Sequence, residues 1–127
     1  MYFTDRKKLL YENMSHFNRL QEFEKELEKL GKKYSSLYDD LKKFERLIEV
    51  NSTGLGKNFI IIHNSKDVKI IKARVACKSL RDRSMRIIYA YHDKLITFVF
   101  IEIYFKGHKE NEDKERINLY LENLNNS

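Results

Sequence analysis

Residues 85–105, MRIIYAYHDKLITFVFIEIYF, decide the fold of this chain. Both halves of the stretch are rich in β-branched and aromatic residues, which favour strands. The polar residues 92–94 (HDK) separate the two halves and are typical of a short hairpin connection. We therefore expect two antiparallel strands, over residues 85–91 and 96–105.

The sequence before this hairpin predicts a third strand over residues 68–78. Its side chains alternate in character: Ile71, Ala73, Val75 and Cys77 have one parity, and Lys72, Arg74, Ala76 and Lys78 have the other. A period of two predicts a strand with one buried face and one basic face. Residues 59–62 (FIII) form either a short edge strand or part of a loop.

The first half of the chain has the period of a helix. Apolar residues recur every three or four positions at Phe17, Leu20, Phe23, Leu27 and Leu30, and again at Leu37, Leu41, Phe44 and Ile48. We expect two antiparallel helices, with Gly31 ending the first and Ser35 or Ser36 capping the second. Residues 51–56 (NSTGLG) follow as a loop. The same period predicts a closing helix, at Ile117, Tyr120, Leu121 and Leu124.

The N-terminal residues allow two interpretations. Leu9, Leu10, Met14 and Phe17 either prolong the first helix, or residues 16–20 form a short first strand. With 127 residues the chain suits one domain. The predicted fold class is α+β, with an N-terminal helical hairpin packed on a small twisted antiparallel sheet and a C-terminal helix.

Composition restricts the class of protein. The chain has no Pro, 4 Gly and 1 Cys, which argues against a disordered chain and against a disulfide-rich secreted scaffold. No apolar segment typical of a signal peptide opens the sequence. The longest apolar stretch, residues 95–105, contains Glu102 and is too short to cross a bilayer. We expect a cytoplasmic protein that does not contact the membrane.

The positive charge is concentrated in one segment. Residues 51–109 hold 12 Lys and Arg against 4 Asp and Glu, within a chain of net charge +6. Residues 1–50 are nearly neutral and residues 110–127 are acidic. A localised positive field attracts RNA, DNA or an acidic protein. The alternative is a solvated basic surface that binds nothing.

The basic residues of this segment are the candidate functional residues. They are Lys72 and Arg74 on one strand, Lys78, Arg81 and Arg83 in the loop that follows, Arg86 at the start of the next strand, and Lys106, His108 and Lys109 after the last strand. If the strands are adjacent, these groups surround one concave surface that binds several phosphates. RNA cleavage by its own 2′-OH needs no metal, and cations stabilise the crowded phosphate. A lysine among other cations is pushed toward its neutral form, which suits a base.

Other chemistries fit less well. The four histidines, His16, His63, His92 and His108, have no zinc-ligand spacing. Cys77 lies on the predicted buried face, where a core thiol is expected. Residues 54–57 (GLGK) lack the full spacing of a phosphate-binding loop. Glu102 either holds Arg86 or Arg74 in place or acts as a base. The strand aromatics stack on RNA bases or belong to the sheet core: Tyr89, Tyr91, Tyr104 and Phe105.

Two longer runs resemble the RelE/ParE superfamily of toxins. Residues 17–44, FNRLQEFEKELEKLGKKYSSLYDDLKKF, are similar to the opening of those proteins, which start with a short strand and a helical hairpin. Residues 84–117, SMRIIYAYHDKLITFVFIEIYFKGHKENEDKERI, are similar to their last two strands and closing helix. The resemblance implies a single toxin domain over residues 14–127, preceded by an extension over residues 1–13 that has a helical pattern.

The resemblance also implies an activity and partners. It implies the toxin of a type II toxin–antitoxin system, a ribosome-dependent and metal-independent endoribonuclease that cleaves mRNA and is held inactive by a small cognate antitoxin. No small-molecule cofactor is implied. Two alternatives remain within the same fold, a ParE-like poison of DNA gyrase and a binding protein without catalytic activity.

The family's functional residues match this chain in part. Lys72 and Arg74 match a Lys-x-Lys pair on the second strand, and Arg86 matches an arginine that opens the third. Lys106 or His108 lies where the family has a cation after the last strand. The family's C-terminal Tyr has no counterpart in residues 111–115, so His108 becomes the candidate proton donor.

Overall fold

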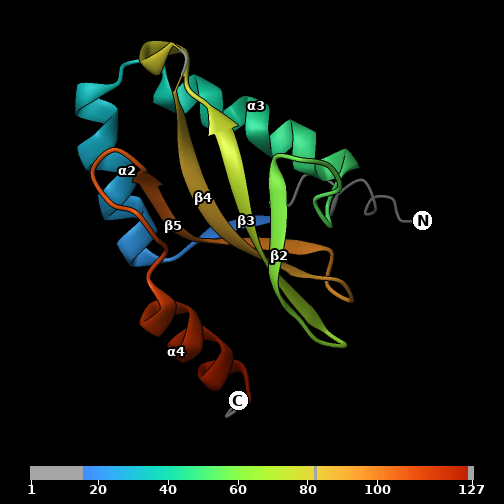
Figure 1. Cartoon of the computed structure of the whole chain (residues 1–127). Helices are drawn as coiled ribbons and strands as arrows, with labels where there is room; N and C mark the ends of the chain where they lie inside the picture. The colour runs from blue at the N-terminus through green and yellow to red at the C-terminus, as the bar shows by residue number, and fades with distance from the viewer. Residues whose placement is uncertain (1–15, 82, 126–127) are drawn as a thin grey trace, which may run out of the picture.

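The described part of the chain folds into three α-helices and a five-stranded sheet (Figure 1). The computed structural model describes residues 16–81 and 83–125, so the extension expected over residues 1–13 lies outside the described residues. The elements in chain order are β1 (Phe17–Arg19), α2 (Gln21–Lys33), α3 (Leu37–Val50), β2 (Phe59–Asn64), β3 (Val68–Ala76), the 3-10 helix η1 (Lys78–Leu80), β4 (Ser84–His92), β5 (Thr97–Phe105) and α4 (Lys114–Asn125). The predicted α+β class is confirmed.

The sheet is mixed, which corrects the prediction of a wholly antiparallel sheet. Its strand order is β1-β5-β4-β3-β2, and β2 to β5 form the expected antiparallel meander, with residues 59–62 in the edge strand β2. The edge strand β1 runs parallel to β5, with Phe17 opposite Phe98. Their rings stack with centroids 5.0 Å apart. Residues 17–19 are therefore a strand, and the helix does not extend through them.

Helices α2 and α3 cover one face of the sheet. The side chains that they bury include Phe23, Leu27, Leu41, Phe44 and Ile48. These pack on sheet residues of one parity, among them Ile71, Ala73, Val75, Cys77, Ile87 and Ile103. The buried face predicted for residues 71–77 is confirmed. Each large apolar side chain buried in this layer contributes about 1.5–3 kcal/mol to folding, so the layer is the main source of stability.

Gly31 does not end the first helix, contrary to the sequence prediction. Helix α2 continues to Lys33. A Cβ atom at Gly31 would lie only 2.5 Å from the ring of Tyr38, on the neighbouring helix. The glycine therefore leaves room for the exposed ring of Tyr38 to lie against α2. Ser36 precedes α3 as expected, but its hydroxyl donates to the Asp40 carboxylate at 2.7 Å.

Helix α4 covers only part of the opposite face of the sheet. Ile117 of α4 packs on Val68 and Ile70 of β3 and on residues of β4 and β5. Lys72 and Arg74 continue the same face of β3 away from this contact. One end of the face is thus apolar and covered by a helix, while the other end carries the predicted basic side chains.

An ion pair closes the exposed part of the β5 edge. Strand β1 pairs only with residues 98–100 of β5. Beyond them, the N–H of Ile103 donates to Glu26 at 3.2 Å, and Arg116 donates to the carbonyl of Ile101 at 2.8 Å. Arg116 also donates twice to Glu26, at 3.0 and 2.8 Å. Unpaired edge groups recruit other strands, so this pair protects the edge and links α4 to α2.

We expect Arg116→Met to lower the free energy of unfolding by about 2 kcal/mol, because it leaves the Glu26 carboxylate and a strand carbonyl without their charged donor. Urea unfolding measures the change. Lys114→Met is the matched control, because it removes the same charge from the same helix at a residue that is exposed. Equal effects of the two changes would contradict this account of the edge.

The attachment of α4 depends on a neutral histidine. His92 is hydrogen-bonded to the hydroxyl of Tyr120 on α4, and burial lowers the pKa of His92 below 6.5. The unfolded chain therefore takes up this proton at a higher pH than the folded chain does. The stabilising contribution is complete above pH 6.5 and decreases as the pH falls below that value.

The difference in unfolding free energy between wild type and His92→Gln should accordingly shrink as the pH is lowered from about 7.5 to about 5. This range spans the ordinary pKa of histidine, about 6.5. Urea titrations across this range measure it. His63→Gln, a change of a half-buried histidine on β2, serves as the control. A pH-independent difference for His92→Gln would show that its ionisation is not linked to folding.

Candidate nucleic-acid interface

The basic end of this sheet face carries two rows of side chains across three strands, and the second row adjoins the part that α4 covers. In one row Arg74 of β3 lies opposite Arg86 of β4, which lies opposite Tyr104 of β5. In the next row Lys72 of β3 lies opposite Ile88 of β4, which lies opposite Glu102 of β5. Facing residues of neighbouring strands have Cβ atoms about 5 Å apart. The pairing register therefore brings predicted site residues from separate parts of the sequence together.

A basic hollow lies at the end of the first row. It has a volume of about 380 Å³ and is lined by Arg74, Arg83, Ser84, Arg86, Phe105, Lys106 and Gly107. Four of the nine predicted cationic residues thus meet in one place. The Arg83 guanidinium lies over the Phe105 ring at 5.1 Å, and Arg86 donates to the Ser84 hydroxyl at 2.8 Å. Among the described residues, no acidic side chain forms an ion pair with any of the four.

The arginines of this hollow, which we call the arginine hollow, repel one another. Burial lowers the pKa of Arg86, and the positive charge of Arg74 lowers it further. The guanidinium of Arg86 nevertheless remains charged at neutral pH, because arginine does not lose its proton in proteins. Like charges held on facing residues of neighbouring strands are stabilised by an anion that binds between them. The hollow therefore has the chemistry of a phosphate site.

Lys72 lies outside the arginine hollow and is paired with an acid. Its ammonium group donates to the Glu112 carboxylate at 3.0 Å. Burial alone would lower the pKa of Lys72, but the hydrogen bond to Glu112 and the neighbouring Tyr104 outweigh burial and raise it. The surroundings of Lys72 therefore favour its charged form, in contrast to the neutral lysine expected from the sequence. Its nearest charged partner is a carboxylate instead of another cation.

Glu102 binds neither Arg86 nor Arg74, which corrects the expected pairing. Its carboxylate is completely buried, forms an ion pair with Lys109, and accepts a hydrogen bond from the N–H of Asp113 at 2.8 Å. Asp113 in turn accepts from the N–H of Arg116 at 3.0 Å and so caps α4. Glu102 thus holds the connection between β5 and α4 against the sheet, and Lys109, predicted to bind RNA, is paired with this acid.

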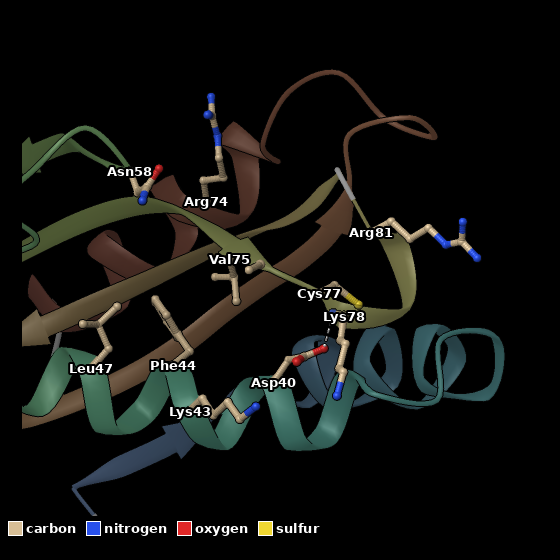
Figure 2. A pocket seen from close by; sticks show the side chains of 11 residues that line it. Asp40, Lys43, Phe44, Leu47, Asn58, Arg74, Val75, Cys77, Lys78 and Arg81 are labelled. Carbon is tan, nitrogen blue, oxygen red and sulfur yellow. Dashed lines mark hydrogen bonds between the residues drawn. The ribbon is translucent and has the colours of Figure 1, made fainter.

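The remaining candidates lie beside the arginine hollow. The His108 ring packs edge-on against Phe105, with centroids 4.9 Å apart, and His108 is exposed. Since Phe105 lines the hollow, His108 lies at its rim. Lys78 and Arg81 instead line a separate groove of about 460 Å³ between α3 and the end of β3, to which Arg74 also contributes (Figure 2). In this view Arg74 points away from α3, whereas Lys78 lies beside Asp40.

Two residues of the interface were not predicted as site residues: Ser84 positions Arg86, and Glu112 neutralises Lys72. Tyr104, predicted either to stack on bases or to belong to the sheet core, completes the arginine row. Tyr104 is only 5% exposed, and its hydroxyl has no hydrogen-bond partner among the described residues. The sequence contained a signal for Tyr104, because it has the same parity as Glu102 on β5. Ser84 and Glu112 are recognisable only once the strands are paired.

Other site types have less support in the geometry. Cys77 is buried, as predicted, and burial raises the pKa of its thiol. Within residues 16–81 and 83–125, no three His, Cys, Asp or Glu side chains gather as metal ligands would. The described helices include none with the length and apolar composition needed to cross a bilayer. No protein-family model and no curated protein matches the chain.

We expect inorganic phosphate to raise the thermal unfolding midpoint more than sodium chloride of equal ionic strength does. A site filled at tenfold its Kd adds about 1.4 kcal/mol to the stability of the folded state. Arg74→Met combined with Arg86→Met should abolish the difference between the two salts. Lys78→Met combined with Arg81→Met removes the same charge from the neighbouring groove and should retain it. Loss in both pairs would mean that phosphate binds by net charge alone.

Proposed function

We propose that this chain is a RelE-like toxin, a ribosome-dependent and metal-independent endoribonuclease that acts on mRNA in the cytoplasm. The observation that carries this proposal is the arginine hollow, in which Arg74, Arg83, Arg86 and Lys106 meet without an acidic partner among the described residues. RNA already contains its nucleophile, the 2′-OH. An enzyme that cleaves it therefore needs chiefly to position one phosphate and to stabilise the charge that builds up there.

The order of elements supports the same proposal. A short strand, a helical hairpin, an antiparallel meander and a closing helix follow one another, as the resemblance to the RelE/ParE superfamily leads us to expect. Arg74 and Arg86, the two positions that match the family's second and third strands, face each other in the pairing register. A RelE-like arrangement of the sheet and helices is therefore part of what we propose.

The proposed reaction places the scissile phosphate between Arg74 and Arg86. The 2′-oxygen forms a bond to phosphorus while the bond from phosphorus to the 5′-oxygen breaks, which yields a 2′,3′-cyclic phosphate and a 5′-hydroxyl. The arginines and Lys106 stabilise the additional negative charge of the transition state. The 2′-OH releases its proton to solvent, and protonated His108 at the rim donates a proton to the leaving 5′-oxygen.

The proposed partner that controls this activity is a small cognate antitoxin. Four uncompensated cations in one hollow would be neutralised by an acidic segment, and a segment bound there would exclude RNA. We therefore propose that the inhibitory part of the antitoxin carries Asp or Glu side chains.

One observation favours a second candidate, a protein that binds RNA without cleaving it. The described lining of the arginine hollow contains no carboxylate, and Lys72 is held protonated by Glu112. Neither group is thus placed as an efficient general base. RNA binding without cleavage on ribosomes would establish this candidate in place of the ribonuclease.

Induced expression of the wild-type chain should arrest bacterial growth and cut mRNA within translated codons. Arg86→Ala should reduce cleavage by about 10²–10³, the effect of removing one group that stabilises a transition-state charge. Primer extension on a translated message, with purified ribosomes and protein, measures the cuts.

Arg81→Ala is the matched control, because Arg81 has the same charge and lines the neighbouring groove instead of the hollow. It should retain both growth arrest and cleavage. Undisturbed growth and intact mRNA with the wild type would overturn the proposed ribonuclease. An equal loss in the two variants would show that general charge, and not the hollow, governs the activity.

A further inference from the structure

We infer that Lys72 and Tyr104 form a second phosphate-binding position beside the arginine hollow, and that the Glu112 carboxylate occupies this position in the free protein. The inference rests on the proposed function, because it names where a neighbouring phosphate of the same RNA strand binds. It gives Tyr104 and Glu112 roles in binding phosphate, and it gives Lys72 a binding role in place of a base role.

The position lies one step along the strands from the arginine row. Lys72 and Arg74 are two residues apart on one face of β3, and two residues along a strand span about 7 Å. Successive phosphates of an extended RNA strand are separated by a similar distance. A strand with one phosphate between Arg74 and Arg86 therefore brings the next phosphate to Lys72.

Tyr104 provides an independent sign that a ligand is missing. Its hydroxyl is buried and donates no hydrogen bond to any described residue. The Lys72 ammonium interacts with the phenol oxygen but can only donate, so the hydroxyl proton has no acceptor. Buried hydroxyl groups nearly always have a partner, so an exception calls for an explanation. The hydroxyl lies beside Lys72 and Glu112, whose charges act on it, and Lys109 lies over its ring at 5.4 Å. A phosphate oxygen bound to Lys72 would accept the unused hydrogen bond of Tyr104.

Glu112 is placed as a substitute for that phosphate. Its side chain is 12% exposed and accepts from Lys72 at 3.0 Å. It belongs to the connection between β5 and α4, which Glu102 fixes through Lys109 and the N–H of Asp113. A phosphodiester carries one negative charge, as a carboxylate does. While Glu112 is bound to Lys72, it therefore keeps a phosphate from binding at this position.

A purely structural ion pair would behave differently. If the Lys72–Glu112 pair only fastens α4 to the sheet, removing Glu112 lowers stability and leaves the number of RNA contacts unchanged. If Glu112 occupies a phosphate position, removing it opens one further contact. The dependence of affinity on salt counts such contacts, since each phosphate neutralised on a single strand contributes about 0.7 to the slope of log K against log salt.

The experiment measures binding of a fluorescent single-stranded 2′-O-methyl RNA, which lacks the attacking hydroxyl, by anisotropy at several salt concentrations. Glu112→Ala should bind about tenfold more tightly than the matched control Glu110→Ala, the effect of one further hydrogen bond to a charged group. Glu110 is exposed and belongs to the same connection between β5 and α4, so Glu110→Ala removes the same charge. The salt slope should rise by about 0.7 in Glu112→Ala only.

Two further variants assign the residues. Lys72→Met should cancel the gain of Glu112→Ala. Tyr104→Phe in the Glu112→Ala background should weaken binding about threefold and leave the salt slope unchanged, because the phenol is uncharged. Circular dichroism confirms folding, and Glu112→Gln with Glu110→Gln replaces the alanine pair if Glu112→Ala is not folded.

Equal affinities or equal salt slopes for the Glu112 and Glu110 variants would overturn the inference. Unchanged binding by Tyr104→Phe would remove the hydroxyl from the proposed position. Cleavage plays no part in this measurement. A wild type that leaves mRNA intact on ribosomes would overturn the proposed ribonuclease, while the comparison of Glu112 with Glu110 would still decide whether the phosphate position exists.

Discussion

The buried carboxylate of Glu102 is the interaction on which the arrangement of the interface depends. A charge without access to water is tolerated only when it is paired and hydrogen-bonded, and Glu102 meets this condition through Lys109 and the N–H of Asp113. Both partners belong to the connection that follows β5. The need to satisfy one carboxylate therefore fixes the connection that carries Lys106, His108 and Glu112, and it also fixes the first turn of α4.

The position of α4 then divides the sheet face into two environments. Where Ile117 packs, the strands contribute apolar side chains such as Ile70 and Ile88, because a helix excludes water there. Where the helix does not reach, the same strands carry Lys72, Arg74 and Arg86. A charged side chain needs either water or an opposite charge, so the uncovered half can keep cations that the covered half cannot.

The sequence predicted the features that depend on local pattern. The alternation in residues 68–78 identified the buried face of β3 and placed Lys72 and Arg74 together on the opposite face, and both were confirmed. It did not predict the parallel pairing of β1, because the apolar spacing that begins at Phe17 fits a helix as well as a strand. It also did not predict the partner of Glu102. That partner depends on how the connection between β5 and α4 folds back, which no local period encodes.

The number of basic residues in a segment does not predict how strongly this face binds a polyanion, because the pairing of those residues with acids also depends on the tertiary fold. Residues 51–109 hold 12 basic side chains, yet Lys72, Lys94 and Lys109 are paired with Glu112, Asp67 and Glu102. A paired cation contributes little to the field that an approaching polyanion experiences, whereas unpaired cations held close together contribute strongly. The binding strength of this face is therefore set by which acids the fold brings to which cations. Glu112 matters more than its single charge suggests, because it lies directly on Lys72.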